Sequence, residues 1–354
     1  MSVPRRRLMF IGTVLLVIVA AGVTWFVVNR DDDDEPGRLG RAIALAPKDT
    51  LRFSWTDWAG IREELGSDVS AASSDDDVAD FLSKGFDADL TSASALGESA
   101  PIMQARYGVS PASADWEMLA QGEHEALLLV GLPKSLDLDT LADNLEELGY
   151  PRPDDADGVW MAGPDVLARI GQVTQELAFV AIDADRHVLA ASDEAETLES
   201  WRTSQRGTDD EDGVSAVVDH VEGALSASVY DGDYACVALS MTDADDADRI
   251  RAAELIEQAG EVNPLRGFAI AALPAGEVRI AMGFESEDQA RTNADSRAKL
   301  ASGPAPGQGG AFSDRYELGP VKADGDVVTM ELDPLPQSYT FSDLANGPLI
   351  FATC

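Results

Sequence analysis

The chain has 354 residues, with 26 Lys and Arg against 64 Asp and Glu, so its formal charge at pH 7 is −38. A field of this sign repels phosphate backbones, and no basic patch follows the first seven residues, so we expect no binding to nucleic acid. Apolar residues make up 45% of the chain, which is enough to bury a core and argues against disorder throughout.

The first thirty residues indicate a membrane anchor. Three arginines at 5–7 precede an uncharged run at 8–28, which as a helix extends about 31 Å and matches the hydrocarbon core of a bilayer. The arginines favour a cytoplasmic tail at 1–7 and place the rest of the chain outside the cell membrane. The small residues at 20–22 leave a second interpretation, a cleaved signal peptide. We expect the anchor because the apolar run continues to Val28.

This topology divides the charge. The first 30 residues contain four Arg and no acid, so the remaining 324 contain 22 basic and 64 acidic residues, a formal charge of −42. The acid excess fits a solvated surface that stays clear of anionic lipid headgroups. Composition does not separate adaptation to salt from a GC-rich genome.

Two cysteines are present, Cys236 and Cys354. An isolated pair outside the cytoplasm predicts a disulfide, which here would tie the C-terminal tail to a strand. Two free thiols are the alternative.

Residues 29–45 form an acidic linker, and folded sequence begins near residue 46. Alternating apolar residues at 51–55 predict a strand, and Asp57 is placed to cap a short helix that ends at Gly66. From residue 67 to 122 we expect helices and loops without a strand, with a helix starting at Ser110-Pro111.

The rest of the chain predicts a repeat. Residues 126–149 indicate a buried strand and an amphipathic helix, and residues 235–260 repeat that plan. A hairpin and a capped helix follow each, through 178–191 with Ser192 or Asp193 as the cap, and through 268–284 with Ser286. Both units therefore read β-α-β-β-α. We expect an α+β fold in which an N-terminal transmembrane helix precedes an ectodomain with two ferredoxin-like β-α-β-β-α repeats.

The expected boundaries follow from this interpretation. The first unit occupies 125–205, a linker with a short helix occupies 206–233, the second unit occupies 234–301, and two further strands and the tail occupy 302–354. The first unit also contains an insertion at 151–176.

Three stretches resemble known proteins: LRFSWTDWAGIREELG at 51–66, YGVSPASADWEMLAQG at 107–122 and the terminal GPLIFATC. They are similar to those of uncharacterised, membrane-anchored cell-envelope proteins of actinobacteria. The resemblance implies the compartment and the fold, and it implies no activity and no catalytic residue.

Motifs for catalysis are missing from the sequence. We find no nucleophile elbow, P-loop, HExxH, CxxC or dinucleotide-binding fingerprint, and we expect no catalytic residue and no cofactor. The three histidines, His124, His187 and His220, lie in separate segments and fit structural positions. Five tryptophans at 55, 58, 116, 160 and 201 fit core packing better than a carbohydrate platform.

One acidic loop was tested as a calcium site. In residues 208–219, Asp210, Asp212 and Asp219 fall at positions 3, 5 and 12 of a loop like that of an EF-hand. The first position is Thr and the last is Asp in place of Glu, so the pattern makes a weak calcium candidate and we expect no metal.

These features favour a single-pass membrane protein whose acidic external domain binds or organises cell-envelope partners without catalysis. Its contacts would be the membrane, through residues 8–28, and an envelope protein. A solute- or cation-binding ectodomain is the alternative, followed by a hydrolase of unfamiliar type.

Overall fold

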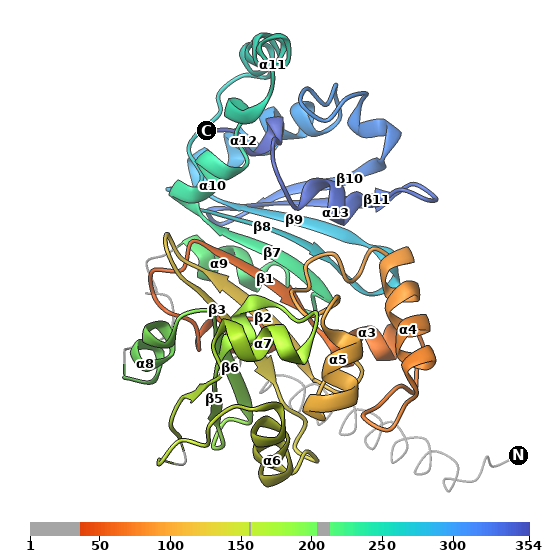
Figure 1. Cartoon of the computed structure of the whole chain (residues 1–354). Helices are drawn as coiled ribbons and strands as arrows, with labels where there is room; N and C mark the ends of the chain where they lie inside the picture. The colour runs from red at the N-terminus through yellow and green to blue at the C-terminus, as the bar shows by residue number, and fades with distance from the viewer. Residues whose placement is uncertain (1–35, 156, 204–212) are drawn as a thin grey trace, which may run out of the picture. The chain divides into compact units, whose positions relative to one another are not determined.

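A computed structural model describes residues 36–155, 157–203 and 213–354. Eleven strands form one sheet in the order β10-β11-β9-β8-β7-β1-β2-β3-β6-β5-β4, and all neighbouring strands are antiparallel (Figure 1). The strands are β1 Arg52–Thr56, β2 Trp116–Gln121, β3 Ala126–Gly131, β4 Trp160–Met161, β5 Phe179–Asp183, β6 Val188–Ser192, β7 Ser226–Asp231, β8 Gly267–Ala272, β9 Val278–Gly283, β10 Tyr316–Asp324 and β11 Val327–Pro334.

Helices cover both faces of this sheet. The α-helices are α2 Arg38–Ile43, α3 Trp58–Glu64, α4 Asp75–Asp87, α5 Ala100–Ile102, α6 Leu138–Leu148, α7 Pro164–Ile170, α8 Ala195–Thr203, α9 Gly213–Asp219, α10 Gly232–Ala238, α11 Asp246–Ala259, α12 Glu287–Ala301 and α13 Thr340–Leu344. Short 3-10 or π turns are η1 Met103–Tyr107, η2 Gln175–Ala178, η3 Met241–Asp243, η4 Pro274–Gly276, η5 Phe312–Asp314 and η6 Ile350–Ala352.

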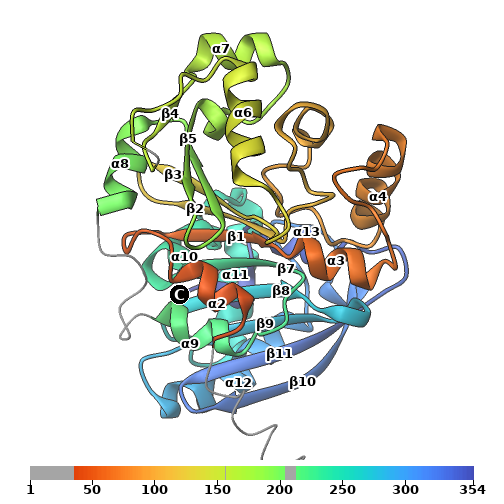
Figure 2. The ribbon, with the colours of Figure 1, turned by 90° about the horizontal axis from the view of Figure 1, so that it is seen from below.

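The side chains of each strand alternate between two cores. On the face that we call face A, apolar strand residues pack against α3 to α7 and α10 to α13. On the opposite face, face B, Phe53, Trp55 and their neighbours pack against α2, α8 and α9. Figure 2 shows α2 and α9 together on that side. Because successive side chains of a strand point in opposite directions, one sheet serves both cores.

The sheet consists of two halves with the same strand order. Strands β1-β2-β3-β6-β5 in the first half match β7-β8-β9-β11-β10 in the second, and β4 extends the first half at its edge. The halves meet where β1 pairs with β7, with Ser54 opposite Ser228. Hydrogen bonds there are mirrored, because Asp57 N donates to Leu225 O and Asp231 N donates to Leu51 O, at 2.8 and 2.9 Å.

The predicted pair of ferredoxin-like β-α-β-β-α units is wrong. Each would have been a separate small sheet, whereas all strands belong to one antiparallel sheet. The error began at the short apolar run at 235–240, where the structure has helix α10, capped by Asp231. The first strand of the second half is β7, which precedes that run. A short apolar run does not distinguish a strand from a buried helix by periodicity.

A second correction concerns residues 67–122. The expected helix after Ser110-Pro111 is a turn followed by strand β2, which forms a hairpin with β3. Helix α2 also begins inside the segment at 29–45 that was expected to be a linker. Several other predicted elements are confirmed: the helix that Asp57 caps, the strand and helix of 126–149, both hairpins and the helix capped by Ser286.

Candidate interaction surface

Two aromatic side chains are exposed side by side. Phe86, near the end of α4, is 57% exposed, and Tyr339, just before α13, is 37% exposed. Their ring centroids are 5.5 Å apart, with the planes inclined by 39°. We call Phe86 and Tyr339 the aromatic pair. Exposed aromatic side chains that gather in one place are typical of interaction sites, because they combine a large contact area with few rotatable bonds.

Helix α4 exposes Phe86 because of its phase. The buried residues of α4 are Val78, Phe81 and Gly85, which follow the spacing of one helical face. Phe86 is one residue beyond Gly85 and therefore points about 100° away from that face. Ser74 begins the helix with a capping box that includes Asp77, so the phase of the helix is fixed at its first turn.

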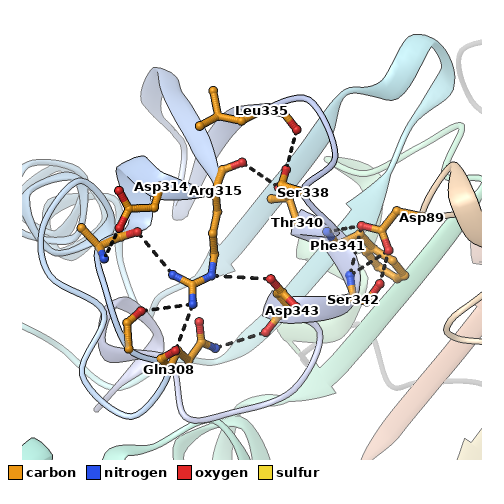
Figure 3. A network of polar contacts seen from close by, with 12 residues as sticks. Asp89, Gln308, Asp314, Arg315, Leu335, Ser338, Thr340, Phe341, Ser342 and Asp343 are labelled. Carbon is orange, nitrogen blue, oxygen red and sulfur yellow. Dashed lines mark hydrogen bonds and ion pairs between the residues drawn. The ribbon is translucent and has the colours of Figure 1, made fainter.

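Asp89 connects the segments that contain the two rings. Its carboxylate accepts hydrogen bonds from Phe341 N at 2.7 Å, from Ser342 N at 3.2 Å and from the Ser342 hydroxyl (Figure 3). Asp89 is three residues after Phe86, and Phe341 is two residues after Tyr339. The contact therefore holds the two rings beside one another although 253 residues separate them in the chain.

The environment of Asp89 is unusual for a carboxylate. Its backbone has a φ of 59°, a left-handed conformation that Asp tolerates better than most residues. Burial raises the pKa of the Asp89 carboxyl, while hydrogen bonds from Ser342 and Phe341 act to lower it, and the charge of Asp343 raises it further. The hydrogen bonds compensate the buried charge and cap the first turn of α13.

Arg315 holds α13 from the other side. Its guanidinium donates to the carbonyl oxygens of Gln308 and Gly309 at 3.0 and 3.2 Å, and its Nε lies 3.5 Å from Asp343 Oδ2 (Figure 3). Thr340 Oγ1 donates to the carbonyl of Arg315 at 3.2 Å. Contacts at both ends of α13 therefore hold the segment that contains Tyr339. The Tyr339 ring itself stays exposed.

Side chains of the sheet form hydrogen bonds with the loop between Phe86 and α5. Glu117 of β2 is buried and accepts hydrogen bonds from Ala95 N at 2.7 Å and from Trp58 Nε1 at 2.8 Å. Ser226 of β7 donates its hydroxyl to the carbonyl of Leu90. Burial raises the pKa of Glu117 to about 7, against the opposing effect of its hydrogen bonds.

Helix α4, which contains Phe86, is acidic. Helix α4 contains five aspartates and one lysine, and that lysine, Lys84, pairs with Asp80 at 2.7 Å. Asp76 and Asp87 are exposed on the same helix. A helix with this excess of carboxylates favours a ligand with positive charge.

The predicted cysteine pair lies on the opposite half of the protein from α4. Cys236 and Cys354 are at disulfide distance, with Cα atoms 5.4 Å apart. Cys236 belongs to helix α10 and not to a strand as expected. Next to the bridge, buried Arg297 donates to the carbonyl oxygens of Asn263 and Thr353 at 2.6 and 2.9 Å. The bridge and this arginine together hold the C-terminal tail.

The other residues singled out in the sequence form no common site within the described part of the chain. Asp210 and Asp212 lie outside the described residues, and Asp219 ends α9. In the described ranges, no group of three or more His, Cys, Asp or Glu is arranged to hold a metal. His124, His187 and His220 occupy a hairpin turn, a strand-connecting turn and the end of α9. Four of the five tryptophans are buried: Trp55, Trp58, Trp160 and Trp201.

A surface cavity of about 330 Å³ lies beside the turn after β5. Two arginines line it, and each is paired with an aspartate at 2.7 Å, Arg186 with Asp183 and Arg202 with Asp157. A smaller cavity of about 230 Å³ is lined by residues near the ends of α11 and α12. Neither one brings together the convergent buried polar groups that a solute-binding site needs.

Comparisons with known proteins give no relative: no protein-family description, curated protein or solved structure matches this chain. No helix in residues 36–155, 157–203 and 213–354 is long and apolar enough to cross a membrane. The predicted anchor at 8–28 lies outside the described residues.

Sequence reasoning missed the aromatic pair. A helical signal for Phe86 was present, because it falls outside the stripe of Val78, Phe81 and Gly85. Tyr339 follows PLPQS in a loop without periodicity, so its exposure depends on how α13 docks.

Proposed function

We propose that this chain is a single-pass cell-envelope protein, anchored by residues 8–28, whose external domain binds a protein partner through the aromatic pair without catalysis. The observation that supports the proposal is that Phe86 and Tyr339 are exposed together on segments that Asp89 joins by hydrogen bonds. Interface hot spots are enriched in aromatic residues, and a contact surface that is already ordered loses less entropy on binding.

The acidic charge beyond residue 30 supports an external location and binding through the aromatic pair. At −42, the part beyond residue 30 is repelled by anionic lipid headgroups. A surface of this kind keeps the aromatic pair available to a partner.

Site-specific photo-crosslinking in intact envelopes tests the proposal. A photoreactive residue is introduced at exposed Ser83, which lies one helical turn before Phe86, and at exposed Glu257 of α11 as a matched control. We expect a discrete crosslinked product from position 83 and not from position 257. This product should disappear when Phe86→Ala and Tyr339→Ala are combined. Identical products from both positions, or none from position 83, would contradict the proposal.

A further inference from the structure

We infer that the partner inserts a cationic side chain of a basic protein segment over the rings of Phe86 and Tyr339. This inference rests on the proposed function and identifies the chemistry of the partner. The ligand class is a segment rich in arginine or lysine, recognised by two aromatic faces and by the aspartates of α4.

Charge distinguishes among the partners that could bind the aromatic pair. A second copy of this chain has the same acid excess, so two copies repel one another at close approach. A membrane surface with anionic lipids is repelled for the same reason. A segment with positive charge is attracted by the whole domain and by the five aspartates of α4.

The geometry of the rings suits a cation. Two rings in contact, with centroids 5.5 Å apart and planes inclined by 39°, are both exposed and can offer an aromatic surface to a cation. This chain already packs guanidinium groups on rings, because Arg52 lies 5.1 Å from the centre of Tyr230 and Arg152 lies 5.4 Å from that of Trp160. A guanidinium at similar distances from an exposed ring gains electrostatic attraction and buries apolar area.

The nearest cation of α4 does not fill this role. Lys84 is two residues before Phe86, so its side chain points to a different side of the helix. Its ammonium pairs with Asp80 at 2.7 Å. The exposed carboxylates of Asp76 and Asp87 extend the attraction beyond the rings.

Binding of a labelled hexa-arginine peptide to the full chain in neutral-lipid nanodiscs tests the inference. Fluorescence anisotropy at physiological salt gives the affinity, and a hexa-citrulline peptide of the same shape measures the part that does not need charge. We expect the combined Phe86→Ala and Tyr339→Ala variant to bind hexa-arginine about tenfold more weakly. Tyr339→Phe should bind like the wild type, because it keeps the ring.

Matched controls separate this site from general attraction to an acidic protein. Val237→Ala with Ile250→Ala removes two other exposed apolar side chains, which are 66% and 65% exposed, and should leave the affinity unchanged. Asp76→Asn with Asp87→Asn should weaken binding more than Glu254→Gln with Glu257→Gln on α11. Thermal unfolding of each variant confirms that the fold is intact.

Two results would overturn the inference. Equal affinity of the aromatic variant and the wild type would show that hexa-arginine binds only by diffuse charge. Equal binding of hexa-citrulline would show that the interaction does not need positive charge. The crosslinking at position 83 is independent of both: a crosslinked partner without arginine preference leaves the proposed function standing, whereas arginine binding without a partner in the envelope refutes that function alone.

Discussion

At the scale of single residues, a few buried polar groups determine how the interaction surface is presented. Asp89 fixes the aromatic pair through hydrogen bonds to the first turn of α13. Glu117 supports the same loop from the sheet. Both carboxylates are more buried than is usual for their type, so their contribution depends on the donors that surround them.

Substitutions at Asp89 separate the role of its carboxylate as a hydrogen-bond acceptor from the role of the residue in a left-handed backbone conformation. Asp89→Ala removes the acceptor and places a poorly suited residue at a φ of 59°, so we expect a loss of about 2 kcal/mol in the free energy of unfolding. Asp89→Gly should be less destabilising than Asp89→Ala, because glycine adopts a positive φ without strain. Asp89→Asn should have nearly the stability of the wild type, because asparagine tolerates this φ and keeps an acceptor oxygen. Urea unfolding measures the series, with Asp87→Asn as the exposed control. Equal stability of the Ala variant and the wild type would refute the role of Asp89.

The pKa of Glu117 predicts a dependence of stability on pH. It is raised from 4.5 to about 7, so between these values the folded protein binds more protons than the unfolded chain. The free energy of unfolding should therefore fall as pH rises from about 4.5 to about 7, by about 3 kcal/mol from this group. The raised pKa of Asp89 acts in the same direction.

Comparison with Glu117→Gln isolates this contribution. The variant cannot ionise at position 117, so its stability should change less with pH in that window than that of the wild type. Urea unfolding at intervals between pH 4.5 and pH 8 measures both proteins. Parallel curves would show that Glu117 does not titrate as its burial predicts.

At the scale of elements, the helices and strands that could be predicted are those whose own residues show both a clear hydrophobic period and residues that mark their ends. The hairpin strands β8 and β9 and the capped helices α6 and α12 were predicted because period and turn residues agree within each segment. Strand β2 was missed because Ser110-Pro111 imitates a helix start, and α10 was taken for a strand because seven residues are too few to show a helical period.

Helix α12 also joins the C-terminal tail to the core through Arg297. Its guanidinium is buried, bonds to the carbonyl oxygens of Phe351, Thr353 and Asn263, and has a pKa lowered by burial to about 9. Removing the guanidinium leaves several buried carbonyl oxygens without a hydrogen-bond donor. Arg297→Met should therefore lower the free energy of unfolding by about 3 kcal/mol or more.

Arg297→Lys should also be destabilising, because one ammonium cannot reproduce the planar fork of bonds. Arg291→Lys on the same helix is the control: its ion pairs are exposed, so it should change stability by less than about 0.5 kcal/mol. Chemical denaturation compares the three variants. If Arg297→Lys matches the Arg291→Lys control, the tail does not depend on the guanidinium.

At the scale of the whole molecule, the pairing of β1 with β7 makes one sheet from two halves. This pairing joins strands about 170 residues apart and has no local signal, which is why the sequence predicted two separate units. The aromatic pair has the same origin, because it requires α4 of the first half to meet α13 of the second.

One continuous sheet predicts one cooperative unfolding transition. Five of the six tryptophans lie at 55–201 in the first half, and the sixth, Trp25, lies in the proposed anchor. The change in tryptophan fluorescence on unfolding in urea therefore reports the first half, while circular dichroism reports both. The two midpoints in urea should coincide. Arg297→Met, in the second half, should shift the fluorescence midpoint as well. A fluorescence midpoint that does not move, beside a biphasic circular dichroism curve, would mean that the halves unfold independently.

The central claim is that Phe86 and Tyr339 form the contact surface for a protein partner. Its most direct test is the yield of the crosslinked product from position 83 in intact envelopes, compared between the wild-type surface and the combined Phe86→Ala and Tyr339→Ala variant at equal abundance. We predict at least a tenfold lower yield in the variant, with no change at position 257. An unchanged yield at position 83 would contradict the claim.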